Sequence, residues 1–155
     1  MRETTSWFVR LNPVPVIAAG TRRLQAAQPQ RPLRGLTRFA ALLDRWLPRY
    51  QGVIRLSGGA RLAVDSREPA QRWLLFSGSY QPAVTHALRA HTPRAGYCLD
   101  IGANLGYYTV MLASWTGPEG RVVACEANPA MAAHTRHNVA LNGFAHVEVI
   151  EQPVD

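Results

Sequence analysis

Residues 96–155 alternate short apolar runs with segments of helical pattern, and this alternation limits the possible folds more than any other feature. The first two apolar runs end at Asp100 and Glu126, and a third covers residues 146–150. The segments between these runs have the periodicity of amphipathic helices. Strands that alternate with helices are typical of right-handed crossovers and a parallel sheet. The pattern therefore predicts an α/β fold with three parallel strands in this region.

Single residues mark where the helices of this region begin and end. Asn128 is a good helix cap, and Pro129 suits the first helical position. Gly143 provides a left-handed stop, so we expect this helix to end at about Asn142. An earlier helix begins at Gly106, and its apolar face is expected to consist of Tyr108, Met111, Leu112 and Trp115.

Residues 1–95 have a different organisation. Four prolines interrupt residues 1–35, so residues 1–50 are predicted to form a basic, irregular arm with one helix at Leu36–Trp46. Residues 51–95 form a second unit. Two apolar runs at 53–56 and 61–64 flank paired glycines and predict a β-hairpin. A helix is expected from Pro82 to about His91.

The charge of the chain is concentrated in its first half. Up to Ala95 there are 15 arginines and 4 acids, and from Gly96 onward 2 arginines and 6 acids, so balances of +11 and −4 give the net +7. A basic half of this kind suits a phosphate-rich partner or a solvated arm. Nucleic-acid surfaces interleave basic residues with aromatic platforms, and this pattern is missing here. We therefore expect no nucleic-acid partner.

Other classes of function have little support in the sequence. No stretch reaches the roughly 18 apolar residues that a membrane span needs, so no span is expected. Cys98 and Cys125 fall in predicted buried strands and are expected to be free thiols of a cytoplasmic protein. His134 and His137 share a helix, but no carboxylate or thiol accompanies them, so we expect no metal site.

The segment from Asp100 to Gly106 has the composition of a ligand-binding turn. Asp100 ends the first strand, and glycines in the turn allow backbone to approach a ligand closely. Ligands of open α/β sheets bind at this carboxyl edge. Glu126 lies 20 residues after Gly106, where a carboxylate can accept hydrogen bonds from both hydroxyls of an adenosine ribose. The alternative is a purely structural role. In that case Gly102 and Gly106 serve only a tight strand-to-helix connection, and Glu126 is a solvated carboxylate at the end of a strand.

The chemistry of the turn favours a cationic ligand over a dinucleotide. A dinucleotide turn needs a second glycine where this chain has Asn104, because the pyrophosphate lies against bare backbone there. Asp100 would also repel a phosphate, whereas it suits an ammonium or a sulfonium. S-adenosylmethionine carries both cations on an adenosine and has no phosphate. The turn therefore favours S-adenosylmethionine over NAD.

Four segments resemble the FkbM family of class I methyltransferases, from about Gly52 to the end of the chain. Leu99–Thr109 resembles the family's D-x-G-A-N-x-G-Y-Y-T run, and Glu126–Pro129 resembles its E-P-N-P. Arg136–Gly143 resembles R-x-N-x-x-L-N-G, and Gly78–Pro82 is similar to G-x-Y-E-P. Two positions differ from the family: Ala127 replaces a proline and Gln81 replaces a glutamate.

The resemblance implies a Rossmann-like class I methyltransferase half-sheet, preceded by the hairpin and helix segment and the irregular arm. It also implies an enzyme that transfers a methyl group from S-adenosylmethionine to a hydroxyl of a sugar or secondary metabolite. Asp100 would lie near the methionine ammonium, the turn would line the cofactor's tail, and Glu126 would hold the ribose. The expected cofactor-binding residues are Asp100, Gly102, Ala103, Asn104, Gly106, Glu126 and Ala127.

The expected domain at 96–155 is incomplete at its C-terminus, because a full sheet of this family has seven strands. An acceptor pocket and catalytic residues are therefore not assigned. We expect an open sheet edge, an uncovered apolar face, and a chain that is inactive or poorly soluble by itself. Two other readings stay open. The basic half suits a methyltransferase acting on RNA, and the missing strands suit a non-catalytic nucleotide-binding remnant.

Overall fold

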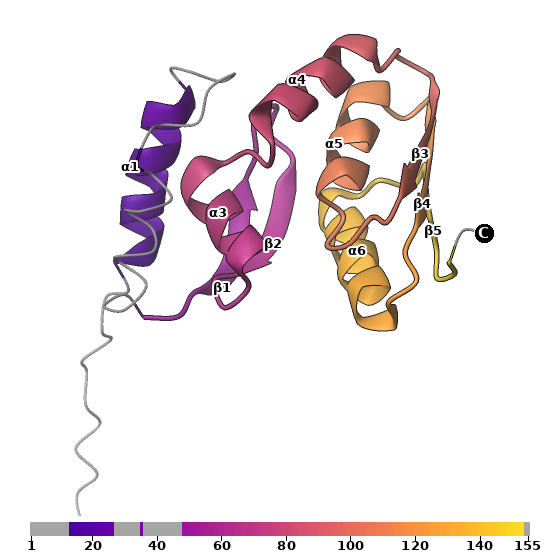
Figure 1. Ribbon diagram of the computed structural model, residues 1–155. Helices are drawn as coiled ribbons and strands as arrows, with labels where there is room; N and C mark the ends of the chain where they lie inside the picture. Colours follow the sequence, from indigo (N-terminus) through magenta and orange to yellow (C-terminus); the bar gives the residue numbers. More distant parts are fainter. Residues whose placement is uncertain (1–12, 27–34, 36–47, 154–155) are drawn as a thin grey trace, which may run out of the picture.

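The computed structural model describes residues 13–26, 35 and 48–153 (Figure 1). The expected helix at Leu36–Trp46 lies outside these residues. The N-terminal part consists of helices around a small hairpin, and the C-terminal part is a parallel sheet with helices on one side. The elements are α1 (Val14–Ala26), β1 (Gln51–Arg55), β2 (Arg61–Asp65), α3 (Pro69–Ser77), α4 (Pro82–His91), β3 (Tyr97–Ile101), α5 (Tyr107–Thr116), β4 (Arg121–Cys125), α6 (Pro129–Asn142) and β5 (Val147–Ile150).

The parallel sheet has the strand order β3-β4-β5. Cys98 pairs with Val122 in the first ladder, and Val122 pairs with Val147 in the second. Both connecting helices, α5 and α6, lie on the same side of the sheet (Figure 1). The α/β fold and its parallel sheet were predicted from the alternating pattern and are confirmed.

The two faces of this sheet differ in what covers them. Val122 and Ala124 on the helix side are completely buried. On the other side Tyr97, Leu99 and Ile101 of β3 are 85%, 60% and 59% exposed. Among the described residues β3 has a strand partner only at β4, so its outer edge is open. The expectation of an open edge and an uncovered apolar face is therefore confirmed.

Strands β1 and β2 form the predicted hairpin. They pair antiparallel with Gln51 opposite Asp65 and Arg55 opposite Arg61. Gly58 and Gly59 connect the strands with φ angles of +88° and +91°, a backbone region that costs glycine little.

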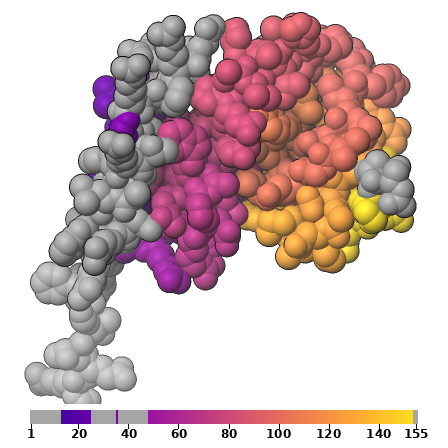
Figure 2. Space-filling model, in the orientation of Figure 1, coloured from indigo at the N-terminus to yellow at the C-terminus, as the bar shows by residue number. Residues whose placement is uncertain are grey.

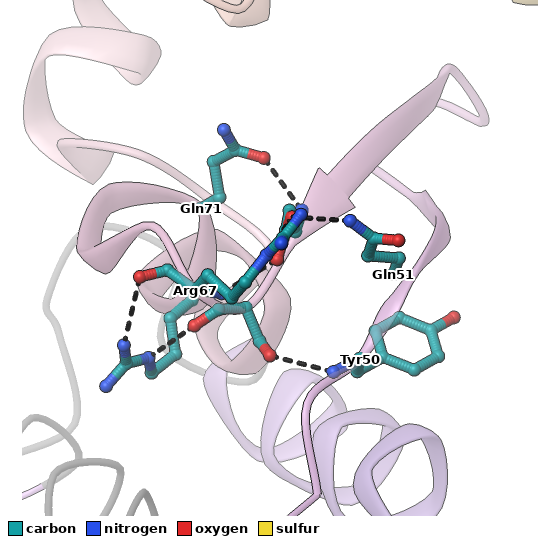
Figure 3. A network of polar contacts seen from close by, with 7 residues as sticks. Tyr50, Gln51, Arg67 and Gln71 are labelled. Atoms are coloured by element: carbon teal, nitrogen blue, oxygen red, sulfur yellow. Dashed lines mark hydrogen bonds and ion pairs between the residues drawn. The ribbon is translucent and has the colours of Figure 1, made fainter.

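A network of polar contacts closes the open end of the hairpin and joins it to α3 (Figure 3). The Asp65 carboxylate accepts hydrogen bonds from Gln51 Nε2 at 2.6 Å and from Arg67 Nε at 2.7 Å. The Asp65 amide donates to Gln71 Oε1 at 2.7 Å, and the Tyr50 amide donates to Ser66 Oγ at 2.9 Å. The Arg67 guanidinium holds the pKa of Asp65 well below its usual range.

The structure corrects the prediction of an irregular arm at residues 14–26, because these residues form helix α1. Pro13 precedes this helix and Pro15 lies in its first turn, where a missing amide costs nothing. Val14 and Ala18 are buried. Thr21 Oγ1 donates to the Phe76 carbonyl of α3 at 2.7 Å. A proline pattern that suggests irregular chain is therefore compatible with a helix when the prolines fall at its start.

Helix α3 is a second element that the sequence analysis did not predict. The apolar run Trp73–Phe76 lies within it, and Leu74 and Leu75 are each 1% exposed. Gly78 ends the helix at a φ of +72°. Helix α4 has the predicted bounds, Pro82–His91.

The hairpin packs directly against the helices of the parallel sheet through β2. On the face drawn in Figure 2 the magenta residues of the hairpin region adjoin the orange residues of the C-terminal part. Leu62 and Val64 of β2 belong to one apolar core with Val110 and Met111 of α5. No helix in residues 13–26 and 48–153 is long and apolar enough to cross a membrane.

Candidate functional site

Asp100 lies near the carboxyl end of β3, where its side chain points toward the start of α5. Asp100 Oδ2 accepts a hydrogen bond of 2.5 Å from Thr109 Oγ1. Burial raises the pKa of Asp100 above its ordinary value, and the charge of Glu126 adds to this effect. The hydrogen bond from Thr109 acts in the opposite direction. A partly desolvated carboxylate of this kind gains most from a cationic partner.

Glu126 follows β4 and connects the two turns at this edge of the sheet. Its Oε2 accepts from the Asn104 amide at 2.7 Å, and its Oε1 accepts from the Asn128 amide at 2.9 Å. Ala127 lies in the turn after β4, between Glu126 and Asn128, and is exposed. A carboxylate has about four acceptor positions, so its chemistry leaves capacity for two hydroxyl groups of a ligand.

The turn between β3 and α5 has three residues in the left-handed region: Gly102, Asn104 and Gly106 at φ angles of +76°, +52° and +85°. Gly102 is exposed, and a Cβ added there would meet no atom within 4 Å. Ala103 is 7% exposed, and its amide donates to the Cys125 carbonyl at 3.1 Å. The side of the turn at Gly102 is therefore bare backbone beside open space, as close approach of a ligand requires.

Helix α6 holds the turn from behind through two side chains that the sequence analysis did not assign to the site. Thr135 Oγ1 donates to the Asn104 carbonyl at 2.6 Å, and Asn138 Nδ2 donates to the Leu105 carbonyl at 2.8 Å. Asn138 falls in the R-x-N-x-x-L-N-G segment, which drew attention to the helix end without a role for this side chain. No pattern in the sequence marks Thr135.

Three tyrosines lie beside the site. Tyr107 packs edge to face on Tyr80 and Tyr108, with ring centroids 6.1 Å and 5.1 Å apart. Tyr108 Oη donates to Gln81 Oε1 at 3.2 Å. Burial raises the pKa of Tyr108, and the neighbouring Asp100 charge contributes in the same direction. The segment before α4 therefore contacts the start of α5 through the glutamine that departs from the family motif.

The periodicity of α5 predicted that Tyr108 is the buried tyrosine, and the structure corrects this. Tyr107 is 4% exposed, whereas Tyr108 is half-buried. Nearly every residue of α5 is buried, because the hairpin covers the side away from the sheet. A helix that is enclosed all round has no single apolar face for a pattern to reveal.

Metal binding and a separate hollow were the other possible sites in the described chain, and neither has comparable support. Residues 13–26 and 48–153 contain no group of three His, Cys, Asp or Glu side chains that could hold a metal ion. A shallow hollow lies at the amino ends of the strands, lined by Tyr97, Gly120, Arg121, Ala145, His146, Val147 and Glu148. An exposed ion pair between Arg121 and Glu148 joins two of these residues. The glycine turn and its two acids lie at the opposite edge.

Residues 83–152 match the model of the Protein-L-isoaspartate(D-aspartate) O-methyltransferase (PCMT) family. This match runs from Ala83 in α4 past the end of β5, so it includes Asp100, the glycine turn and Glu126. The Protein-L-isoaspartate O-methyltransferase of Methanopyrus kandleri is 33% identical over 85 residues. That alignment covers 54% of this chain and 37% of the relative, so the chain spans little more than a third of the relative's length.

Solved structures share the fold at low sequence identity. Pyrococcus horikoshii TYW2, solved in complex with MeSAdo, has a TM-score of 0.53 at 14% identity, over 85% of this chain and 50% of that one. A transferase from the same organism has a TM-score of 0.53 at 13% identity, over 88% and 64%. The chain shares a Rossmann-like α/β fold with these structures. The fold class expected from the sequence is thereby confirmed.

Proposed function

We propose that this chain binds S-adenosylmethionine at the turn between β3 and α5, and that the reaction for which it binds this cofactor is O-methylation. One observation carries the proposal: Glu126 contacts the Asn104 amide of the turn at 2.7 Å, so the two strand-end acids and the bare Gly102 backbone belong to one site. In this arrangement Asp100 faces the cationic end of the ligand and Glu126 faces the ribose. The match to the methyltransferase family over residues 83–152 supports the same ligand.

We propose a carboxylate of a protein as the methyl acceptor. The names of the matching family and of the Methanopyrus kandleri relative support an aspartyl-derived acceptor. A carboxylate oxygen would attack the methyl carbon of the sulfonium without first losing a proton, and the methyl C–S bond would break with S-adenosylhomocysteine, a neutral thioether, as the leaving group. The four segments that resemble the FkbM family support a second candidate, a hydroxyl of a sugar or other small metabolite.

Calorimetry tests the ligand assignment directly. S-adenosylhomocysteine, which keeps the adenosine and the ammonium, is expected to bind the purified chain at least about tenfold more tightly than NAD, about 1.4 kcal/mol. The expected difference arises because the NAD pyrophosphate meets Asp100 and lacks a second glycine to lie against. Equal or tighter binding of NAD would overturn the assignment.

Base treatment distinguishes the two acceptors. The protein is incubated with S-adenosylmethionine that carries a radioactive methyl group, together with either an isoaspartyl peptide or a polyhydroxylated metabolite. The radioactivity on each acceptor is then measured. A methyl ester on a carboxylate is hydrolysed in mild alkali, whereas a methyl ether on a hydroxyl survives. Base-labile label on the peptide supports the carboxylate acceptor, and base-stable label confined to the metabolite supports the hydroxyl.

Asp100→Asn is expected to raise thermal stability at pH 7. The pKa of Asp100 is raised in the folded chain, so the folded state binds its proton more tightly than the unfolded state does. Its contribution to stability is therefore complete below about pH 4, the ordinary value for aspartate, and is lost as the pH rises through the folded pKa. Asparagine stays neutral at every pH in this range, so the variant does not lose stability through ionisation at this position. Its side-chain oxygen still accepts the hydrogen bond from Thr109.

Melting temperatures measured from pH 3 to pH 8 check this expectation. The Asp100→Asn variant should melt above the wild type at pH 7, and the difference should shrink toward zero as the pH approaches 3. The same variant should bind S-adenosylhomocysteine more weakly, because the carboxylate that faces the ammonium is gone. A variant that melts below the wild type at pH 7 would show that burial of the charge is not the dominant effect.

A further inference from the structure

Helix α6 carries a pair of buried polar residues in a core that is otherwise largely apolar. Thr135 and Asn138 are each 0% exposed and lie three residues apart, so they share one face of the helix. A buried amide or hydroxyl is costly unless it is hydrogen-bonded. In the described residues every buried side-chain polar atom has a partner. The partners of these two side chains therefore define what they do.

On one side, the pair holds the backbone of the turn that forms the candidate site. Thr135 binds the Asn104 carbonyl, and Asn138 Nδ2 binds the Leu105 carbonyl. The Asn104 amide, on the ligand side, is bound by Glu126. Asn104 is thus held at both ends in a left-handed conformation that L-residues seldom adopt.

On the other side, α6 binds the outer edge of the hairpin. Asn138 Oδ1 accepts from the Ala63 amide at 2.8 Å. One helical turn later, Asn142 Oδ1 accepts from the Arg61 amide and Asn142 Nδ2 donates to the Arg61 carbonyl, both at 2.7 Å. Four helical residues rise about 6 Å, and two strand residues advance about 6.6 Å, so the two side chains match the spacing of an edge strand.

Asn138 is the residue at which these two sets of contacts meet. Its amide oxygen binds β2 and its amide nitrogen binds the turn, whereas Asn142 binds β2 and its own helix. We propose that Asn138 is a positioning residue that couples docking of the hairpin to the conformation of the cofactor turn. This coupling deepens the proposed function, because it makes the contact of Asn138 with the hairpin, in contrast to that of Asn142, a determinant of S-adenosylmethionine binding.

The variants Asn138→Ala, Asn138→Asp and Asn142→Ala separate coupling from a general loss of packing. Alanine at 138 removes both the hydrogen bond from the Ala63 amide and the one to the Leu105 carbonyl. Aspartate keeps an acceptor for the Ala63 amide but loses the donor to Leu105. Alanine at 142 removes contacts to the same strand and leaves the turn untouched. All three are compared at a temperature where circular dichroism shows each chain fully folded.

Amide hydrogen exchange without ligand is the first measurement. Exchange at Asn104 and Gly106 is expected to be about tenfold faster in both Asn138 variants, the equivalent of one lost buried hydrogen bond, and within twofold of wild type in Asn142→Ala. Similar acceleration in Asn142→Ala, or none in the Asn138 variants, would overturn the coupling. Asn138→Asp keeps the bond from the Ala63 amide and loses the one to Leu105, so faster exchange at Ala63 as well in this variant is the result expected from coupling, and unchanged exchange at Ala63 would overturn it. This measurement needs no ligand, so it decides the coupling even if the chain fails to bind S-adenosylhomocysteine.

Binding of S-adenosylhomocysteine is the second measurement. The dissociation constant should rise about tenfold in both Asn138 variants and less than twofold in Asn142→Ala. In the wild type, the ligand should also slow exchange of the Ala63 amide, because coupling between two sites is reciprocal. Equal affinities in all variants, with wild type binding normally, would overturn the coupling and leave the proposed function standing. A wild type that binds no ligand would overturn the proposed function instead.

Discussion

Replacing Gly106 with alanine is expected to destabilise the chain by about 2–5 kcal/mol. Gly106 has a φ of +85°, a conformation that costs an L-residue about 1–2 kcal/mol. An added Cβ would lie 2.9 Å from Thr135 Cγ2 and 3.2 Å from Thr135 Cα, and overpacking of this kind costs about 1–3 kcal/mol. The second contact is with helix backbone, so α6 itself would have to move. A loss of this size is a large part of a typical domain's stability.

Gly102→Ala is the matched control for this substitution. Gly102 also has a positive φ, +76°, but no atom lies within 4 Å of the position that its Cβ would take. Only the backbone strain is therefore expected, about 1–2 kcal/mol. Urea unfolding of both variants measures the difference. Equal losses of stability would show that α6 can move away from Gly106 at little cost.

Replacing Glu126 with alanine is expected to weaken S-adenosylhomocysteine binding by about 1–3 kcal/mol, roughly 5- to 150-fold. The carboxylate has two roles in the proposed site. It is available to both ribose hydroxyls, and it binds the Asn104 amide at 2.7 Å and the Asn128 amide at 2.9 Å. Alanine removes the ribose contacts and also leaves the Asn104 amide without its acceptor. Calorimetric titration with S-adenosylhomocysteine measures the loss.

Glu119→Ala provides the control, because it makes the same change of charge at an exposed turn between α5 and β4. Its affinity for S-adenosylhomocysteine should stay within about twofold of wild type, since an exposed distant charge is largely screened. Glu126→Gln should be intermediate, because one acceptor oxygen is kept. If Glu126→Ala and Glu119→Ala bind equally well, Glu126 does not hold the ribose.

The elements that were predictable from sequence are those that local residues delimit. The helix from Asn128 onward begins as expected, because the Asn128 side chain accepts from the Ala130 amide at 2.9 Å and Pro129 occupies the first helical position. It ends at Gly143, which has the left-handed φ of +69°. Such signals act within one turn of helix, so they work without knowledge of the rest of the fold.

The features that were missed depend on distant partners. Helix α1 is held against α3 by Thr21 and Phe76, which are 55 residues apart. Thr135 reaches Asn104 across 31 residues, and Asn138 reaches Leu105 across 33. A hydroxyl or amide on a helix looks the same in sequence whether it faces water or a buried carbonyl. The acids and glycines of the candidate site could be proposed from sequence because their chemistry is local to two strand ends.

The long separation between the hairpin and α6 has a consequence for the order of folding during synthesis. The edge of β2 is satisfied by Asn138 and Asn142, which follow their partners by 75 and 81 residues. A ribosome adds about 5–20 residues per second, so the hairpin exists for roughly 4–16 s before α6 is made. During that interval its Arg61 and Ala63 amides are open to other strands. The duration of this interval sets how long the nascent chain depends on dilution or a chaperone.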